Sequence, residues 1–315
     1  MMDLNLTAIE AQEERSPGIT AFTRECYVEE FEAWTARGAD EWWRSVKAPI
    51  KVADVREAIR CTKKGTSPGP SEITSDMLAD LDDEALAYIA KLFDQCLQEG
   101  HIPDVMNCAL MTLLPKTDDG LSNLLKTRPI ALMEIITKVY ERIIIGRVVK
   151  VLDEHNMLNK AQYGGLAKLG TAAPLRVMAN VLEDAQNTGN ELHLFVADLS
   201  KAFDSIEYWT QGLSWRALGM PKDIVDVMVD LDAGTHHPGR SGQKGAGATT
   251  SVNLGQGRKT PPLTHGRGVR QGSVGGPIKW LVAMNFWLNY VQKKLGGKGY
   301  TMGGTEFLEQ MYVDD

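Results

Sequence analysis

Apolar residues recur at helical spacing over much of the chain. Between residues 83 and 99 they fall on one helical face, after two aspartates and before Gly100. This spacing predicts a helix with one buried face and a defined start and stop. The same spacing predicts further helices over residues 25–43, 52–64, 134–152, 174–185, 206–218, 221–231 and 277–294. In the helix 134–152 we expect Ile and Val to face the core and the charged residues, Glu141 among them, to face solvent.

Short apolar runs predict strands. They occur at residues 109–114 and 192–197, and residues 250–254 and 260–264 can form a hairpin. Helices that alternate with strands indicate an α+β fold with helices packed on an antiparallel sheet. The run 192–197 has the length and residue types of a buried strand, and Asp198 follows it directly. A carboxylate there needs a partner or a metal, although an Asp that caps the following helix is an equal alternative.

The charge is unevenly distributed. The 315 residues include 34 Lys and Arg against 41 Asp and Glu, a net charge of −7, which argues against extensive coating of nucleic acid. Residues 233–270 nevertheless contain no carboxylate and many glycines. We predict a local nucleic-acid surface there, with a disordered surface loop as the alternative. Its basic residues are Arg240, Lys244, Arg258, Lys259, Arg267 and Arg270.

Several functional classes find no support. The four cysteines are scattered without a metal-binding spacing, so reduced structural thiols are expected. The first 18 residues have neither an apolar signal core nor an Arg-rich character. The most apolar run, residues 280–291, is too short to span a membrane. We therefore expect a soluble intracellular protein with no membrane partner.

Two more aspartates close the sequence. Tyr312-Val-Asp-Asp315 places adjacent carboxylates after an apolar pair, and both can face one site only at a turn. With Asp198, Asp314 and Asp315 make three hard oxygen donors, which suit Mg²⁺, with Mn²⁺ as a substitute. Three carboxylates around two divalent ions suit in-line phosphoryl transfer. The sequence thus indicates nucleotidyl transfer.

These motifs resemble those of reverse transcriptases, most closely the non-LTR retrotransposon (LINE-like) type. Residues 198–204, Asp-Leu-Ser-Lys-Ala-Phe-Asp, are similar to motif A of that family. Gly-Val-Arg-Gln-Gly at 268–272 is similar to motif B, and 312–315 to motif C. The resemblance covers nearly the whole chain. It implies the fingers and palm of a right-hand polymerase, with an RNA template, a DNA primer and deoxynucleoside triphosphates as partners.

The resemblance also implies roles for individual residues. Arg128, helped by Lys116, would hold the triphosphate, because cations on the finger strands do so in the family. Each could instead be an ordinary exposed cation. Gln271 and Gly272 would line the nucleotide site. Phe203 corresponds to the aromatic residue beneath the sugar, where a 2′-hydroxyl would clash.

The chain departs from the family pattern at three glycine-rich places. Ser71 follows Pro-Gly-Pro where Asp is usual, Gly165 replaces an aromatic, and Gly276 precedes Pro277 where Ser is usual. These departures leave a catalytically decayed palm that binds RNA as an alternative. An RNA-dependent RNA polymerase is a second alternative, although Arg-Gln-Gly and Tyr-Val-Asp-Asp favour a reverse transcriptase.

The order of the motifs predicts the domain organisation. We expect an N-terminal helical extension over residues 1–64, a fingers-like region with the start of the palm over 65–190, and a palm over 191–315. Residues 232–268 form a Gly-rich basic insertion or hairpin in that palm. No thumb is expected before residue 315, and we expect residues 1–315 alone not to polymerise, because the turn of motif C would end without its returning strand.

Overall fold

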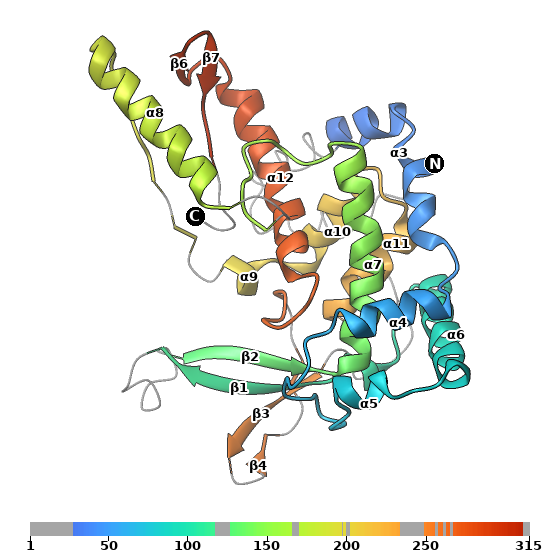
Figure 1. Cartoon of the computed structure of the whole chain (residues 1–315). Coiled ribbons are helices and arrows are strands. Elements are labelled where there is room, and N and C mark those ends of the chain that lie inside the picture. The colour runs from blue at the N-terminus through green and yellow to red at the C-terminus, as the bar shows by residue number, and fades with distance from the viewer. Residues whose placement is uncertain are drawn as a thin grey trace, which may run out of the picture.

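The computed structural model describes most of the chain. It covers residues 28–116, 127–165, 170–196, 198–199, 202–233, 249–255, 258–260, 263–264 and 267–310. Most of the helices pack together, and a small sheet lies below them in the view of Figure 1. After a first helix at residues 28–36, the helical elements are α3 (Ala39–Trp42), η1 (Trp43–Lys47), α4 (Val52–Arg60), α5 (Ser75–Ala79), α6 (Asp83–Glu99), η2 (Asp104–Asn107), α7 (Ile135–Glu154), α8 (Ala172–Thr188), α9 (Ala202–Ser205), α10 (Tyr208–Ala217), α11 (Lys222–Ala233) and α12 (Gly276–Leu295).

Helix α7 is the centre of the main hydrophobic core. Figure 1 shows α10 and α12 on one side of it, and α4 and α6 toward the other. Ile135, Val139, Tyr140, Ile144 and Val148 of α7 are fully buried in that core. Burial of large aliphatic and aromatic side chains is the main stabilising term in such a body, at about 1.5–3 kcal/mol for each aliphatic side chain.

The predicted helices other than 25–43 are present, with ends that differ by a few residues, and local signals set several of those ends. The Asp82 carboxylate accepts a hydrogen bond from the backbone N–H of Ala85 and so caps α6. Gly100 ends α6 with φ of 65°, a left-handed conformation that glycine adopts without strain. The predicted helix 25–43 is instead interrupted at Gly38, whose φ is 78°. Residues 25–27 lie outside the described part of the chain.

The main sheet joins segments that are far apart in sequence. Strands β1 (Ala109–Pro115) and β2 (Thr127–Met133) form an antiparallel pair in which Leu114 lies opposite Arg128. Strand β3 (Thr249–Gly255) pairs with β1 in parallel, Ala109 opposite Thr250. Strands β4 (Arg258–Lys259) and β5 (Leu263–Thr264) pair antiparallel with β3. The predicted hairpin is therefore present, and the sheet that it joins is mixed. The antiparallel palm sheet that would carry the aspartates stays a prediction.

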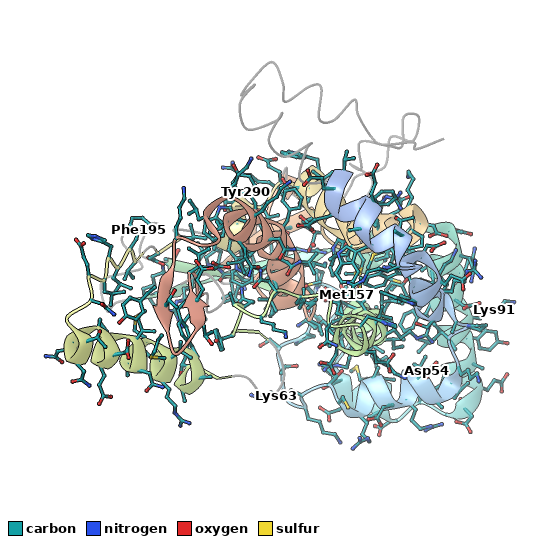
Figure 2. All side chains as sticks on the ribbon, turned by 90° about the horizontal axis from the view of Figure 1, so that it is seen from above. Asp54, Lys63, Lys91, Met157, Phe195 and Tyr290 are labelled. Carbon is teal, nitrogen blue, oxygen red and sulfur yellow. The ribbon has the colours of Figure 1, made fainter. Side chains whose placement is uncertain are left out.

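The prediction of a buried strand at 192–197 is wrong for the residues described. Residues 191–196 have no secondary structure, and Phe195 and Val196 are 91% and 79% exposed. Phe195 lies at the edge of the molecule in Figure 2. An apolar run becomes a strand only when a neighbour supplies hydrogen-bond partners, and no described strand pairs with this one. Asp198 therefore does not end a sheet strand in this structure.

A small hairpin packs beside α8. Strands β6 (Tyr300–Met302) and β7 (Thr305–Phe307) form it, and the Tyr300 hydroxyl donates to the Asp184 carboxylate at 2.6 Å. Among the described residues, no helix has both the length and the apolar character needed to cross a membrane.

Candidate active site

The loop at 268–272 lies directly against the helix that carries Phe203. The Gly268 N–H donates to the Ile206 carbonyl at 2.7 Å, and the Val269 N–H donates to the Phe203 carbonyl at 2.9 Å. Gly268 has φ of 91°, and a Cβ there would lie 2.9 Å from the Asp204 carbonyl oxygen. Only glycine permits this close approach without strain. The stretches that resemble motifs A and B are thereby joined.

The other side of the same loop contacts strand β2. The Ala131 N–H donates to the Gln271 carbonyl at 2.7 Å. Gly272 has φ of 127°, and a Cβ there would overlap the Ala131 carbonyl oxygen. Gln271 is half-buried and Gly272 is exposed, so this part of the loop is accessible to a ligand. The loop is held between α9 and β2.

The two predicted phosphate-binding cations lie on the β1–β2 ribbon. Arg128 is exposed on β2, three residues before Ala131, and Lys116 is exposed immediately after β1. The structure thus places Arg128 on the same strand that touches Gln271 and Gly272. Their role in binding a triphosphate stays a prediction.

The three predicted metal ligands are only partly described. Asp198 is exposed in a segment without secondary structure, and Asp314 and Asp315 lie outside the described residues. Among the described residues, no group of three His, Cys, Asp or Glu side chains could hold a metal ion. Asp198 is a hard oxygen donor exposed to solvent, which suits a divalent cation such as Mg²⁺. Its role as a metal ligand together with Asp314 and Asp315 stays a prediction.

Phe203 is half-buried and packs on α12. Its ring lies 5.5 Å from the Trp280 ring, at 34° between the planes. Ala202, Ile206 and Val269 belong to the same small cluster. Phe203 therefore has a packing role whether or not it contacts a sugar.

The six basic residues predicted to contact nucleic acid have different outcomes. Arg240 and Lys244 lie outside the described residues, as does the side chain of Arg258 on β4. Lys259 is exposed, and Arg267 is exposed with one guanidinium nitrogen 3.7 Å from the Glu207 carboxylate. For these residues nucleic-acid contact stays a prediction.

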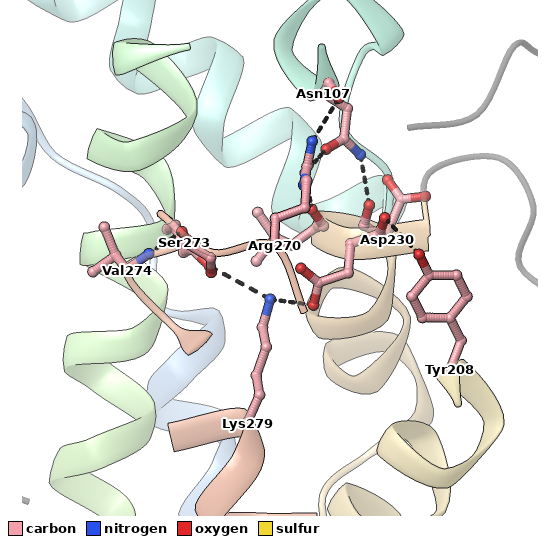
Figure 3. Close-up of polar contacts among 10 residues, drawn as sticks. Asn107, Tyr208, Asp230, Arg270, Ser273, Val274 and Lys279 are labelled. Atoms are coloured by element: carbon pink, nitrogen blue, oxygen red, sulfur yellow. Dashed lines mark hydrogen bonds and ion pairs between the residues drawn. The ribbon is translucent and has the colours of Figure 1, made fainter. Parts of the chain in front are cut away.

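The prediction for Arg270 is wrong. Its side chain is buried, and its guanidinium donates to the Asn107 carbonyl at 2.8 Å, to the Asn107 side chain and to the Leu231 carbonyl. A guanidinium with these internal acceptors does not reach a phosphate. Its planar fork of donors instead joins η2 to α11 (Figure 3).

Sequence reasoning missed a buried ionic cluster beside Arg270. The Lys279 ammonium lies 2.7 Å from Asp232 and 3.4 Å from Glu141, and all three side chains are at most 1% exposed (Figure 3). The expectation that Glu141 faces solvent is therefore wrong. One signal was available: Lys279 is a single cation in the apolar stretch Ile278 to Val282.

Electrostatics keep this cluster charged at Glu141. Burial alone would raise the pKa of Glu141, but Lys279, the Ser273 hydroxyl and the Val274 N–H lower that pKa below its ordinary value. Burial raises the pKa of Asp232, and Lys279 and Arg270 offset part of that rise. Lys279 is thus shared between the two carboxyl groups and favours the charged form of each.

Comparisons with known proteins agree with the motifs. Residues 114–315 match the family described as reverse transcriptase (RNA-dependent DNA polymerase). The chain is 27% identical over 219 residues to the RNA-directed DNA polymerase from mobile element jockey of Drosophila melanogaster, covering 69% of this chain and 24% of that protein.

Two further relatives come from other elements. The chain is 22% identical over 273 residues to the Pol polyprotein of type-1 retrotransposable element R2 of Nasonia vitripennis, covering 87% of this chain and 24% of that protein. It is 26% identical over 233 residues to that of the type-2 element R2DM of Drosophila melanogaster, covering 74% and 20%. The chain thus spans about a quarter or less of these relatives. The relatives are of the non-LTR retrotransposon type.

Proposed function

The chain belongs to the reverse transcriptase (RNA-dependent DNA polymerase) family, and on that premise we propose that it forms the fingers and palm of an enzyme that copies RNA into DNA. Its substrates would be an RNA template, a DNA primer and deoxynucleoside triphosphates. Residues 65–190 would form the fingers and the start of the palm, and residues 191–315 the palm. Residues 1–64 would be a helical extension.

One observation carries this proposal. The loop 268–272 is bonded to α9 on one side and to β2 on the other, through Phe203 and Ala131. This contact brings Gln271, Gly272 and Phe203 into one neighbourhood with the strand of Arg128. A nucleotide site requires a cation for phosphate, a surface beneath the sugar and polar groups near the base, and these residues can supply them.

Each residue of the proposed site would have a separate role. Arg128, with Lys116, would bind the triphosphate oxygens with charge-assisted hydrogen bonds. Phe203 would exclude a 2′-hydroxyl, and Gln271 would orient the nucleotide through its donor and acceptor. Asp198, Asp314 and Asp315 would hold two Mg²⁺ ions, which when bound activate the primer 3′-hydroxyl and stabilise the transition state. Lys259, Arg267 and, in the same segment, Arg240, Lys244 and Arg258 would contact the nucleic-acid backbone.

The test is Mg²⁺-dependent primer extension on an RNA template by the full-length protein. Asp198→Asn should reduce the rate on the order of a hundredfold or more, because a metal ligand is lost. Its circular dichroism spectrum and melting temperature should stay unchanged, because Asp198 is exposed. Asp184→Asn, at an α8 residue hydrogen-bonded to Tyr300, is the matched control and should keep the rate. Extension by Asp198→Asn at the wild-type rate would refute the metal assignment.

A further inference from the structure

Buried groups anchor both residues that flank Gln271 and Gly272. On one side, Arg270 is bonded to Asn107 and to the Leu231 carbonyl. On the other, the Ser273 hydroxyl donates to the Glu141 carboxylate, and the Val274 N–H donates to it at 2.7 Å. Only Gln271 and Gly272 lie between the two anchors.

Lys279 connects the two anchors. It lies 3.4 Å from Glu141, which holds Ser273, and 2.7 Å from Asp232, the neighbour of Leu231. The four side chains Glu141, Lys279, Asp232 and Arg270 comprise two carboxyl groups and two basic groups, and all are buried. Helices α7, α11 and α12 each contribute to this cluster (Figure 3).

The loop is also pressed tightly on α7. A Cβ at Gly275 would lie 2.8 Å from the Ile145 side chain and 2.9 Å from a Glu141 carboxylate oxygen. The anchored turn after Gln271 therefore cannot move toward α7. Glu141 lies on α7, which directly follows β2 in the chain. The helix that anchors the loop is therefore continuous with β2, the strand that the loop contacts.

Stability alone does not explain this cluster. Burying two ion pairs costs desolvation that their attraction only partly repays, and apolar side chains of the same size often stabilise equally well. What fixed charges add is a defined geometry, because each donor and acceptor has few alternatives in a dry interior. The geometry defined here is that of Gln271 and Gly272.

We propose that Glu141, Lys279 and Arg270 are positioning residues that set Gln271 and Gly272 against β2 and thereby control nucleotide affinity. None of them touches the substrate. The inference rests on the proposed function for its kinetic consequence, whereas its structural consequence, an ordered contact between Gln271 and Ala131, does not depend on catalysis.

Two variants release the anchor in different ways. Glu141→Gln keeps an acceptor for Ser273 and Val274 but removes the charge, and Ser273→Ala removes one hydroxyl and leaves every charge in place. In primer extension by the full-length protein, the nucleotide KM should rise by roughly tenfold, because small displacements of positioning groups cost rate and affinity steeply. The Kd for primer and template should stay unchanged. Ser273→Thr keeps the hydroxyl and should keep the wild-type KM.

Leu97→Ala is the control for lost stability. Leu97 is buried in the core on α6, a helix that supplies none of the groups that anchor the loop, so this variant should melt at a lower temperature without a change in nucleotide KM. If Glu141→Gln and Ser273→Ala raise the KM no more than Leu97→Ala does, the positioning role is refuted.

Hydrogen exchange provides a readout that does not need activity. The Ala131 N–H is bonded to Gln271, so its exchange should accelerate in Glu141→Gln and Ser273→Ala but not in Leu97→Ala. Unchanged exchange at Ala131 would refute the inference. A wild-type protein that extends no primer, while Ala131 exchange still responds to Glu141→Gln, would refute the proposed function and leave the positioning role intact.

Discussion

Ser71 binds the Glu134 carboxylate twice, through its backbone N–H at 2.8 Å and through its hydroxyl. Glu134 is buried at the junction of β2 and α7, and Gly69 is so close to it that a Cβ would lie 2.7 Å from the Glu134 nitrogen. The Pro-Gly-Pro segment at residues 68–70 is thus held against the end of β2 by these contacts. The departure from Asp at residue 71 is explained, because an Asp would place a second carboxylate against Glu134.

We therefore expect Ser71→Asp to lower the free energy of unfolding by about 2–3 kcal/mol, through a lost hydrogen bond to a charged group and through repulsion. Adding Glu134→Gln should restore part of that stability, because an amide can donate to the new carboxylate. Chemical denaturation of the single and double variants measures the difference. Equal stabilities for Ser71→Asp and the wild type would show that the contacts of Ser71 with Glu134 are unimportant.

Gly272→Ala should impair nucleotide binding. The added Cβ would overlap the Ala131 carbonyl oxygen at a backbone conformation with φ of 127°, so the loop must move away from β2. We expect at least a tenfold loss in kcat/KM for the nucleotide, on the order of what displaced positioning groups cost. Gly276→Ala is the matched control, because its Cβ would meet Val269 at 3.4 Å, an ordinary contact. Similar kinetics for both variants would contradict the close approach of loop and strand.

Phe203→Val should weaken discrimination between sugars. A smaller side chain leaves room for a 2′-hydroxyl, so the ratio of kcat/KM for ribonucleotide to that for deoxyribonucleotide should rise. The variant should also lose roughly 1–2 kcal/mol of stability, because the contact with Trp280 shrinks. Phe203→Tyr keeps the ring and should keep the ratio. An unchanged ratio in Phe203→Val would leave Phe203 with its packing role alone.

Glu30 makes stability depend on pH. The helix 28–36 packs on α12, where Asn289 donates to Glu30 at 3.0 Å and Lys293 pairs with Glu29. Burial raises the pKa of Glu30 to about 7, and the Asn289 hydrogen bond offsets part of the rise. The folded protein thus keeps a proton that the unfolded chain releases above about pH 4.5.

The stabilisation that protonated Glu30 contributes is therefore fully present below the unfolded pKa. As the pH rises toward 7, the free energy of unfolding falls by up to about 1.4 kcal/mol per pH unit. Glu30→Gln should remove this slope and exceed the wild type in stability at pH 8. Glu29→Gln, one residue away in the same helix, should retain the slope. Melting temperatures between pH 4.5 and 8 test this, and parallel curves for Glu30→Gln and the wild type would contradict it.

The sequence alone determined features that depend on neighbouring residues, such as helix ends, and the order of the motifs along the chain. The bounds of α6 follow from a capping Asp82 and a terminating Gly100, because helix ends depend on groups within one turn. The family follows from the order of three short motifs, since each is defined by neighbouring residue types. The glycines at 268 and 272 could be recognised as places of close approach, although not what they approach.

The tertiary structure decided which charged residues are inside. Glu141 looked like an exposed residue of an amphipathic helix, but α7 is packed on several sides, so a charged residue on it can be enclosed. Lys279 and Arg270 are buried because acceptors arrive from α7, α11 and η2, which are remote in sequence. The apolar run 192–196 does not form a strand because no described strand pairs with it. The apolar pattern within a segment does not specify where a pairing partner lies, so only the tertiary structure decides this.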